Sequence, residues 1–295
     1  MIELIAPAKI NLTLEVLGRR EDGYHAIASI IHMLSLHDTL KLIPSPRVGA
    51  RRQKLSCAAP VCIETEGFPG PTDASNLVWR ALELTGATAK SSWQVKLIKR
   101  IPTEAGLGGG SSDAAAILRH FCSVPDQQGA IAEQLGSDVP FFLNGACARV
   151  EGRGEQVKPL PALPPFWWVL AKPIALGIST AWAYAQLARS TSMGHPTRPA
   201  APTDRLEQAI WQGAIHTPEQ LAPLLHNDFE PVVLPAFEPL QQLRARMATL
   251  GALRVLLCGS GAAQAALCAS RQDAESMANA LRIEGYWAEA VHLGL

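Results

Sequence analysis

The chain has 295 residues, of which 48% are apolar and 18% are charged, and its 26 basic side chains balance its 26 acidic ones. This length allows one large domain or two ordinary ones, and the apolar fraction supplies a sizeable core. The balanced charge argues against a general nucleic-acid or anionic-membrane binder, because such proteins are normally basic.

The sequence also lacks the features of an exported or membrane-inserted protein. No apolar run reaches the length of a membrane span, and the first residues lack the charged start and apolar centre of a signal peptide. The six cysteines are scattered and form no C-x-x-C pair. We therefore expect a reduced, cytoplasmic protein without structural zinc, and no nucleic-acid or membrane partner.

The first predicted element is a strand over residues 7–18. Its apolar residues alternate strictly with polar ones, namely Lys9, Asn11, Thr13 and Glu15. This period of two predicts a half-buried strand. Lys9 and Asn11 then project from the same side, roughly 7 Å apart along the strand. The pattern alone leaves two possibilities for this polar face: exposure to solvent, or a functional site.

Next, Asp22 and Gly23 predict a turn, which Tyr24 and His25 follow directly. An aromatic face and a titratable ring on a loop suit either packing or ligand binding. Residues 30–43 predict one or two further strands, and residues 44–72 predict loops with one short strand. A helix over 75–86, ending at a glycine, and a strand over 93–99 lead to a glycine-rich stretch.

The glycine-rich stretch reads Pro-Thr-Glu-Ala-Gly-Leu-Gly-Gly-Gly-Ser-Ser-Asp-Ala-Ala-Ala and occupies residues 102–116. Glycine has no Cβ, so this backbone can take positive φ and approach a ligand closely. Ser111, Ser112 and Asp113 are good residues for opening a helix, and apolar residues at helical spacing follow from Ala114. A glycine loop that leads into a helix N-terminus makes a phosphate site.

Three other interpretations of this stretch are weaker. The Walker pattern requires Lys-Ser/Thr after its last glycine, where this chain has Ser111 and Ser112. The dinucleotide fingerprint would need a third glycine at Ser111 and an acidic residue on a following strand. A tight loop that only turns the chain remains open, although four glycines lose more backbone entropy than a plain turn requires.

After a short predicted helix over 130–135, Asp138 lies between Gly136 and Pro140, on backbone that is restricted from both sides. By itself it could be an ordinary Asx-turn aspartate. The prolines within 158–165 mark the best boundary, so we expect one domain over 1–158 and a second over 159–295.

The second half predicts strands and helices interleaved. The predicted strands cover 166–171 and 286–292, and residues 255–267 predict a strand, a glycine turn and a second strand. The predicted helices cover 179–189, 237–250 and 273–283, with a capping box at Thr217 and Gln220. Residues 190–203 predict a polar, proline-bearing, mobile loop. This order favours an α+β layer of helices on an antiparallel sheet.

The glycine-rich stretch resembles the phosphate loop of the GHMP small-molecule kinases, whose signature is Pro-x-x-x-Gly-Leu-Gly-Ser-Ser-Ala. Its form at residues 106–115 is similar to the branch of that family that phosphorylates 4-diphosphocytidyl-2-C-methyl-D-erythritol in non-mevalonate isoprenoid synthesis. Pro-Ala-Lys-Ile-Asn-Leu at 7–12 and Gly-Arg-Arg-Glu-Asp-Gly-Tyr-His at 18–25 resemble that branch's N-terminal signature. Gly-Ser-Asp-Val-Pro-Phe at 136–141 and Gly-Ser-Gly at 259–261 also match the family.

The resemblance implies the two-domain α+β fold of the GHMP kinases. Mixed strands and helices with the phosphate loop would form the N-terminal domain, and an antiparallel sheet covered by helices the C-terminal domain, with a cleft between. It also implies that ATP phosphorylates the 2-hydroxyl of the acceptor, with Lys9 and Asp138 as the catalytic pair. Mg²⁺ would be carried by ATP rather than by a protein cage, with Ser111 or Ser112 as a possible ligand.

The resemblance assigns further residues to the two substrates. The residues implied in ATP binding are Pro102, Gly106, Leu107, Gly108, Gly109, Gly110, Ser111, Ser112 and, near the adenine, Lys99. Those implied in binding the cytidine diphosphate acceptor are Asn11, Tyr24, His25, Thr180 and Tyr184. The partner is therefore a small molecule that bears cytidine diphosphate, and the chain would be a monomer or a homodimer.

Two positions depart from the family pattern. Glu104 stands where the family usually has a small residue, so we expect its carboxylate to point outward. Ala262-Ala263-Gln264 lacks the usual serine, threonine or cysteine. Two alternatives stay open. One is a GHMP kinase for homoserine, mevalonate or a sugar, which the turn at 22–25 disfavours. The other is a non-catalytic nucleotide-binding relative, which should have lost Lys9 or Asp138.

Overall fold

The computed structural model describes residues 1–46, 59–191 and 201–294, and these form two compact units. Unit 1 comprises Met1–Ala8, His37–Thr103 and Gly108–Leu143, and unit 2 comprises Lys9–Leu36, Glu104–Leu107 and Asn144–Leu295. Two long strands, β1 (Ile2–Arg19) and β2 (His25–Pro46), contribute residues to both units. The predicted domain boundary at residue 158 is a position in the chain, whereas these two units are defined by contacts in space. The boundary therefore stays a prediction.

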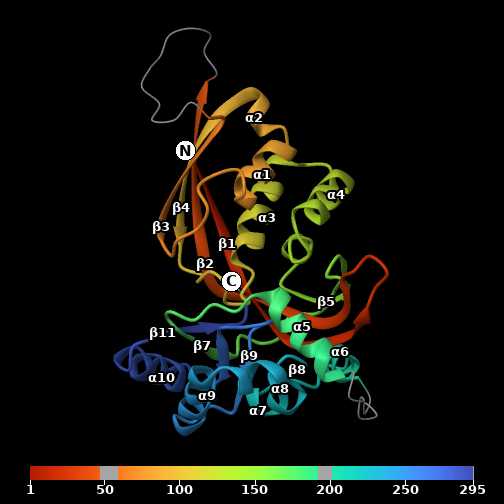
Figure 1. The fold of residues 1–295 in the computed structure, drawn as a ribbon, viewed down its shortest axis with the longest axis vertical. Helices are drawn as coiled ribbons and strands as arrows, with labels where there is room; N and C mark the ends of the chain where they lie inside the picture. The colour runs from red at the N-terminus through yellow and green to blue at the C-terminus, as the bar shows by residue number, and fades with distance from the viewer. Residues whose placement is uncertain (47–58, 192–200, 295) are drawn as a thin grey trace. The chain divides into compact units, whose positions relative to one another are not determined.

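Unit 1 is a sheet with helices on one side. Its strands are β3 (Val61–Gly67), β4 (Ser91–Lys99), the end of β2 and the start of β1, in the order β3-β4-β2-β1. β4 runs parallel to β3 and antiparallel to β2. The helices are α1 (Leu77–Leu84), α2 (Ala87–Lys90), α3 (Gly109–Phe121), α4 (Pro125–Leu135) and the short η1 (Phe141–Leu143). Figure 1 shows α1, α3 and α4 together on one side of these strands.

In unit 2, the first half of β2 pairs antiparallel with β5 (Cys147–Gly152), and β5 pairs with β6 (Gln156–Pro159). The short strand β8 (His226–Asn227) runs parallel to β1, with Thr13 opposite His226.

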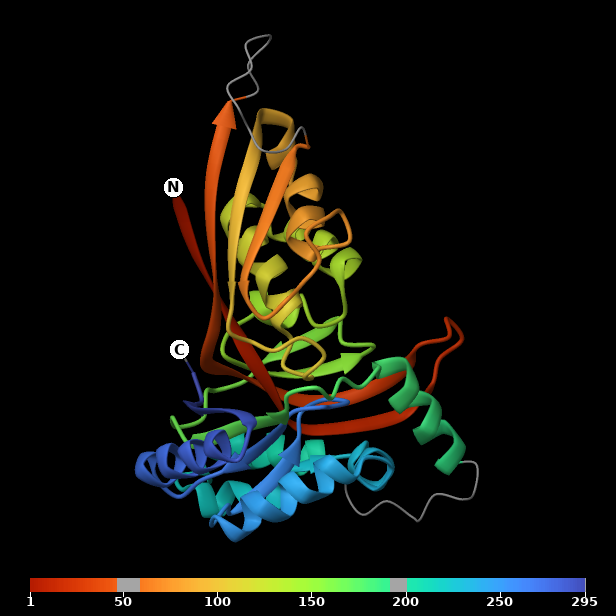
Figure 2. The same cartoon turned by 60° about the vertical axis from the view of Figure 1, so that its left-hand side comes forward.

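A second, antiparallel sheet of unit 2 has the order β11-β7-β10-β9. Its strands are β7 (Trp167–Pro173), β9 (Arg254–Leu257), β10 (Gln264–Leu267) and β11 (Tyr286–His292). Helices α9 (Glu238–Thr249) and α10 (Arg271–Ile283) cover one face of this sheet (Figure 2). Val169 of β7 packs there against Leu243 and Met277 of the two helices. The predicted layer of helices on an antiparallel sheet is therefore confirmed.

The remaining helices of unit 2 lie between these strands in the chain. They are α5 (Thr180–Thr191), α6 (Pro202–Trp211), α7 (Pro218–Leu221), η2 (Ala222–Leu224), α8 (Glu230–Val233) and η3 (Leu234–Ala236). The sequence analysis missed α6, although Pro202 in its first turn and buried Leu206 and Ile210 at helical spacing are signals for it. Most of the loop expected at 190–203 lies outside the described residues.

The prediction that β1 is half-buried was wrong. Residues 6–15 are buried on both faces, including Lys9, Asn11, Thr13 and Glu15. Alternation identifies the two faces of a strand but cannot show that other segments of the chain cover the polar one. None of the helices in the described residues is long and apolar enough to cross a membrane.

Candidate functional site

The glycine-rich stretch forms a left-handed turn that leads directly into α3. Gly106 and Gly108 have φ of 74° and 72°, which favours glycine. The helix begins at Gly109, earlier than the serines from which we expected it to start, and Gly108 is its N-cap residue. The first amide groups of a helix have no acceptor within that helix, and they lie at the positive end of its dipole. The turn thus presents the N–H groups of Gly109, Gly110 and Ser111 for an anion.

The Gly-Ser-Gly turn at 259–261 packs on this loop, backbone against backbone. A Cβ built on Gly106 would lie 1.9 Å from the carbonyl oxygen of Cys258, and one built on Gly259 would lie 3.3 Å from the Cα of Gly106. Asn227 holds the turn in place, because its Nδ2 donates at 2.8 Å to the carbonyl oxygens of Leu257 and Gly259. Two motifs that are remote in sequence therefore meet within unit 2, together with Asn227.

Lys9 is attached to the same loop. Its backbone N–H donates to the carbonyl oxygen of Leu107 at 3.0 Å. Its side chain is buried, and Nζ donates to Oδ1 of Asn11 at 2.6 Å. The structure therefore brings together Lys9, Asn11 and part of the predicted phosphate loop.

A group of aromatic rings lies elsewhere in unit 2. The rings of His25 and Tyr184 are stacked, with centroids 4.5 Å apart, and Phe229 meets Tyr184 edge-on at 4.9 Å. Burial, together with the nearby charge of Arg19, lowers the pKa of His25, so its imidazole is neutral at pH 7. Tyr24 stays exposed, and the guanidinium of Arg153 lies 5.3 Å from its ring centroid.

Thr180 begins α5 and is exposed, and its hydroxyl shares a hydrogen bond of 3.0 Å with that of Ser260. Thr180 and Tyr184 lie on the first turns of one helix. The expected acceptor residues therefore fall into two groups in this unit: Asn11 beside Lys9, and the remaining four on the β1–β2 turn and α5.

Asp138 belongs to unit 1, in a tight turn between α4 and η1. The N–H of Val139 donates to the carbonyl oxygen of Gly136 at 3.1 Å. A Cβ built on Gly136 would lie 4.0 Å from Oγ of Ser111 in the first turn of α3. The turn that carries Asp138 thus lies against the helix that follows the glycine loop. The meeting of Asp138 with Lys9 stays a prediction.

Lys99 ends β4 inside a buried charge cluster. Its Nζ contacts Oδ2 of Asp113 at 2.7 Å and also binds Asp38. Asp38 in addition accepts the backbone N–H groups of Arg100 and Ile101, at 2.6 and 2.9 Å. Burial disfavours the Lys99 ammonium, but the two carboxylates outweigh this and raise the pKa of Lys99. Its ammonium is therefore engaged by protein, and its contact with adenine stays a prediction.

Asp113 is the unusual member of this cluster. Burial, opposed by Lys99 and reinforced by Asp38, raises the pKa of Asp113 to about 7. Its Oδ1 is buried and has no hydrogen-bond partner within the described part of the chain. The first turn of α3 is thus anchored to the end of β4 by a carboxyl group that changes charge near neutral pH.

Glu104 shows why a small residue suits its position. Its φ is 51°, in the left-handed region that favours glycine. Its side chain is exposed, as expected, and its carbonyl oxygen accepts the N–H of Ala262 at 3.0 Å. Burial lowers the pKa of Lys172, and the charge of Glu104 partly offsets this.

The described residues contain no group of three or more His, Cys, Asp or Glu side chains that could hold a metal ion. One feature suits a magnesium ion carried by a nucleotide. The hydroxyl of Ser112, in the first turn of α3, is buried without a hydrogen-bond partner among the residues described. Hydroxyl oxygens are among the hard ligands that Mg²⁺ accepts. The serines after the glycine loop are therefore chemically suited to the ion.

Comparison with known proteins defines the class. Residues 76–146 match the family model "GHMP kinases N terminal domain", and residues 206–286 match "GHMP kinases C terminal". Together with the fold and the glycine loop, these matches show that the chain belongs to the GHMP kinases, and the predicted fold class is confirmed. A homoserine kinase structure from Cytophaga hutchinsonii, 16% identical with a TM-score of 0.67 over 99% of this chain and 94% of that one, shares the fold.

Relatives with higher sequence identity identify the branch of the GHMP kinases to which the chain belongs. The chain is 38% identical to a 4-diphosphocytidyl-2-C-methyl-D-erythritol kinase from Gloeobacter violaceus, over 94% of this chain and 88% of the relative. It is 40% identical to the Synechococcus protein of that name, over 88% and 82%. A crystal structure of 4-(cytidine 5'-diphospho)-2C-methyl-D-erythritol kinase covers all of both chains at 35% identity and a TM-score of 0.78. The chain is a small-molecule kinase of this branch.

Two further residues of unit 2 contact the expected site residues: Ser29, which sequence reasoning missed, and Ser260, which it named only as part of the Gly-Ser-Gly motif. Ser29 accepts a hydrogen bond from Asn11, and Ser260 bonds to Thr180. The signal for Ser29 was a single hydroxyl within the apolar stretch of β2, where it is fully buried. A lone polar residue in such a run needs a hydrogen-bond partner when it is buried, and this need is the only local signal for Ser29.

Proposed function

We propose that this chain transfers the γ-phosphoryl group of ATP to the 2-hydroxyl of 4-diphosphocytidyl-2-C-methyl-D-erythritol, giving the 2-phosphate and ADP. The names of the relatives supply the acceptor. The main observation in support of this reaction is the hydrogen bond from the Lys9 backbone to Leu107, because it fixes a cationic residue to the glycine loop.

Phosphoryl transfer depends mostly on positioning and on stabilising charge. The acceptor oxygen attacks the γ-phosphorus, the bond to the β,γ-bridging oxygen breaks, and the electron pair leaves with ADP. We assign Asp138 to take the hydroxyl proton, because an alcohol is a weak nucleophile at neutral pH. We assign Lys9 to stabilise negative charge on the transferred group. Each residue adjoins the glycine loop from within its own unit, which supports this pairing.

We assign the triphosphate to the N–H groups of the glycine loop and the first turn of α3. This includes Gly106, Leu107, Gly108, Gly109, Gly110, Ser111 and Ser112, with Pro102 shaping the turn and Lys99 toward the adenine. The hydroxyls of Ser111 and Ser112 would hold Mg²⁺ when it is bound with ATP, and the ion would supply positive charge that neutralises the phosphates. The left-handed φ of Gly106 and Gly108 supports this assignment, because it turns the chain into the N-terminus of α3, where the first N–H groups lie.

We assign the acceptor to Asn11 at its reacting end and to Tyr24, His25, Thr180 and Tyr184 at its cytosine end. A neutral imidazole can donate and accept one hydrogen bond each, which suits the edge of a base. The stack of His25 on Tyr184 supports this assignment, because it shows that aromatic rings pack face to face at this position.

The test of the chemistry is the pair Asp138→Ala and Asp126→Ala. Asp126 is an exposed carboxylate in the first turn of α4, in the same unit, so it controls for loss of an acidic side chain. We expect Asp138→Ala to lower kcat at least 1,000-fold, with ATP affinity by calorimetry changed less than threefold. Asp126→Ala should match the parent chain. Full activity of Asp138→Ala would remove Asp138 from the mechanism.

A panel of acceptors tests the substrate. Homoserine, mevalonate, a hexose and the cytidine diphosphate compound would each be incubated with the chain and ATP, and ADP release measured. We expect release only with the cytidine compound. Turnover of an acceptor without cytidine would move the assignment to another GHMP kinase.

A further inference from the structure

The buried polar face of β1 forms a continuous chain of hydrogen bonds in unit 2. Nζ of Lys9 donates to Oδ1 of Asn11 at 2.6 Å, and Nδ2 of Asn11 donates to Oγ of Ser29 at 2.8 Å. The Ser29 hydroxyl in turn donates to the backbone carbonyl of Thr13. All four residues are buried, with Lys9 only 4% exposed.

The direction of these bonds follows from counting hydrogens. A serine hydroxyl has one hydrogen, and in Ser29 it is committed to the Thr13 carbonyl, which can only accept. The oxygen of Ser29 can therefore only accept from Asn11, which must present its NH₂ group. The other end of the amide, Oδ1, must then face Lys9, where an acceptor is needed because an ammonium has only donors. Ser29 thus determines which way the Asn11 amide points.

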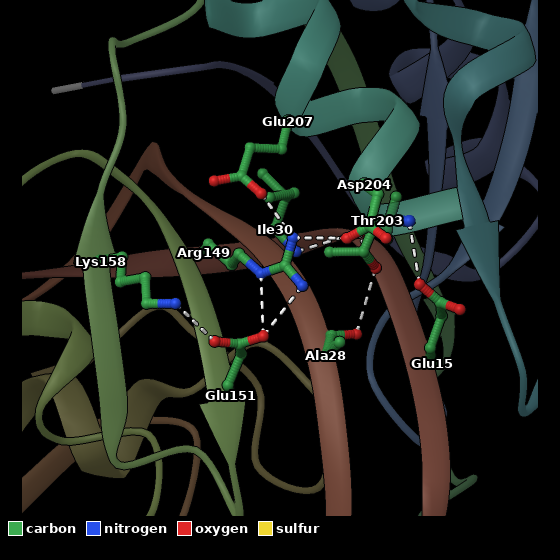
Figure 3. Close-up of polar contacts among 10 residues, drawn as sticks. Glu15, Ala28, Ile30, Arg149, Glu151, Lys158, Thr203, Asp204 and Glu207 are labelled. Carbon is green, nitrogen blue, oxygen red and sulfur yellow. Dashed lines mark hydrogen bonds and ion pairs between the residues drawn. The ribbon is translucent and has the colours of Figure 1, made fainter. Parts of the chain in front are cut away.

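The far end of this chain is held by α6. The hydroxyl of Thr203 donates to that of Thr13 at 3.1 Å, and the Thr203 N–H donates to Oε2 of Glu15 at 2.9 Å. Figure 3 shows Thr203 at the start of α6 beside Glu15 and the Ala28 carbonyl. The Thr13 hydroxyl also accepts the N–H of Ile30 at 2.9 Å.

The same helix is attached to β5 by ion pairs. Arg149 of β5 binds Asp204 at 2.7 Å and also contacts Glu207, and Glu151 bridges Arg149 and Lys158 at 2.9 Å (Figure 3). These contacts fix α6, and through Thr203 they fix the position of Thr13. The carbonyl that orders Ser29 therefore belongs to a residue held from several sides.

We propose that Ser29 is a positioning residue for phosphoryl transfer, which orients the Asn11 amide so that its oxygen holds the Lys9 ammonium in one place. The proposal rests on the proposed function, which gives Lys9 and Asn11 their roles. Without the Ser29 hydroxyl, the amide loses the partner that distinguishes its two ends. Because the site is buried, no water replaces that partner, and the unpaired NH₂ group carries its full desolvation cost. Ser29 need not touch either substrate.

The kinetic test is a double-mutant cycle. Ser29→Ala should lower kcat about tenfold and leave the KM for ATP within twofold. In the background of Asn11→Ala, the same substitution should change kcat less than twofold, because Ser29 acts through Asn11. Ser29→Thr, which keeps the hydroxyl, should recover most of the activity. Ser35→Ala is the control: it removes a hydroxyl from the same strand, where the Ser35 hydroxyl accepts the N–H of His292.

A second measurement needs no acceptor. The side-chain NH₂ resonances of Asn11, identified by their loss in Asn11→Ala, should exchange with solvent slowly in the parent chain and in Ser35→Ala. In Ser29→Ala they should exchange at least tenfold faster. If no acceptor is turned over, the proposed function fails while this exchange still tests the role of Ser29. If the acceptor is turned over but exchange is unaltered in Ser29→Ala, the positioning role is wrong. It is also wrong if the effects of the two substitutions on kcat are independent, so that the double variant shows their product.

Discussion

The imidazole of His25 and the phenol of Tyr184 are parallel to within 15°, with their centroids 4.5 Å apart. A third ring between them would need two such spacings, which would separate the outer rings to about 9 Å. A cytosine must therefore either stack on an outer face or move Tyr184 away from His25. Tyr184 lies on the second turn of α5, and its ring also meets Phe229 edge-on at 4.9 Å.

Removing the Tyr184 ring should weaken acceptor binding without changing the chemistry. An aromatic stack contributes about 1 kcal/mol, which corresponds to a several-fold change in affinity. We expect Tyr184→Ala to raise the KM for the acceptor about fivefold and to leave the KM for ATP unchanged, in steady-state assays. Tyr184→Phe keeps the ring and should stay within twofold; a loss as large as that of the alanine variant would mean that the hydroxyl, not the stack, matters.

Acceptor binding should also weaken in acid. Burial and the charge of Arg19 lower the pKa of His25 below 6.5, so the ring is neutral at pH 7 and gains a proton only as the pH falls through that lowered value. We expect the KM for the acceptor to rise only at a pH below 6.5, where the His25 ring gains its proton. His25→Gln, which cannot titrate, should show no such rise. An acid limb that persists in the glutamine variant would assign it to another group.

Two glycines of the phosphate loop should respond in opposite ways to alanine. A Cβ on Gly106 would overlap the Cys258 carbonyl oxygen at 1.9 Å, on backbone with φ of 74°, whereas one on Gly110 meets nothing nearer than a Leu77 methyl at 3.9 Å. We expect Gly106→Ala to lower the free energy of unfolding by about 2 kcal/mol or more. Gly110→Ala, within α3, should be neutral or stabilise by about 0.5–1 kcal/mol. Urea denaturation measures both, and equal losses would contradict the close packing of the two loops.

The charge cluster at the base of α3 should make stability depend on pH. In the folded chain the pKa of Asp113 is about 7, above its ordinary value of 3.8, so between these values the folded state binds a proton that the unfolded state lacks. The stabilisation that comes from this bound proton is therefore complete below pH 3.8 and is lost as the pH rises through 7.

Asp113→Asn should remove this component. We expect the free energy of unfolding, followed by urea denaturation from pH 5 to 8, to fall less steeply in the asparagine variant, by up to about 1 kcal/mol per pH unit. Asp126→Asn, on the exposed side of α4, is the control and should follow the parent curve. A parent curve that rises between pH 5 and 7, with no difference from Asp113→Asn, would contradict the raised pKa.

The sequence predicted the elements that local signals define. Periodicity located the strands of the second sheet and the helices α9 and α10, and the glycines located the phosphate loop, because each signal lies within a dozen residues. The start of α3 was placed too late, because a helix can begin on glycines when the surrounding backbone holds them.

The buried polar face of β1 could not be predicted, because what covers it is remote. Thr203 binds Glu15 from 188 residues further along the chain, and no local pattern carries that information. The stack of His25 on Tyr184 likewise joins a turn to a helix that begins much later. Resemblance to a family named both rings as site residues, but it did not predict that they contact each other.

Strand β1 gives its first residues to one compact unit and the rest to the other, without a break in the strand. Because neighbouring side chains point to opposite faces, one residue added or lost near Ala8 would turn every later side chain over. Lys9 would then exchange faces with Ile10, placing an ammonium in an apolar layer and an isoleucine on the polar face that Asn11 and Ser29 share. Over evolution this segment should therefore accept exchanges of one residue for another far more readily than changes in its length.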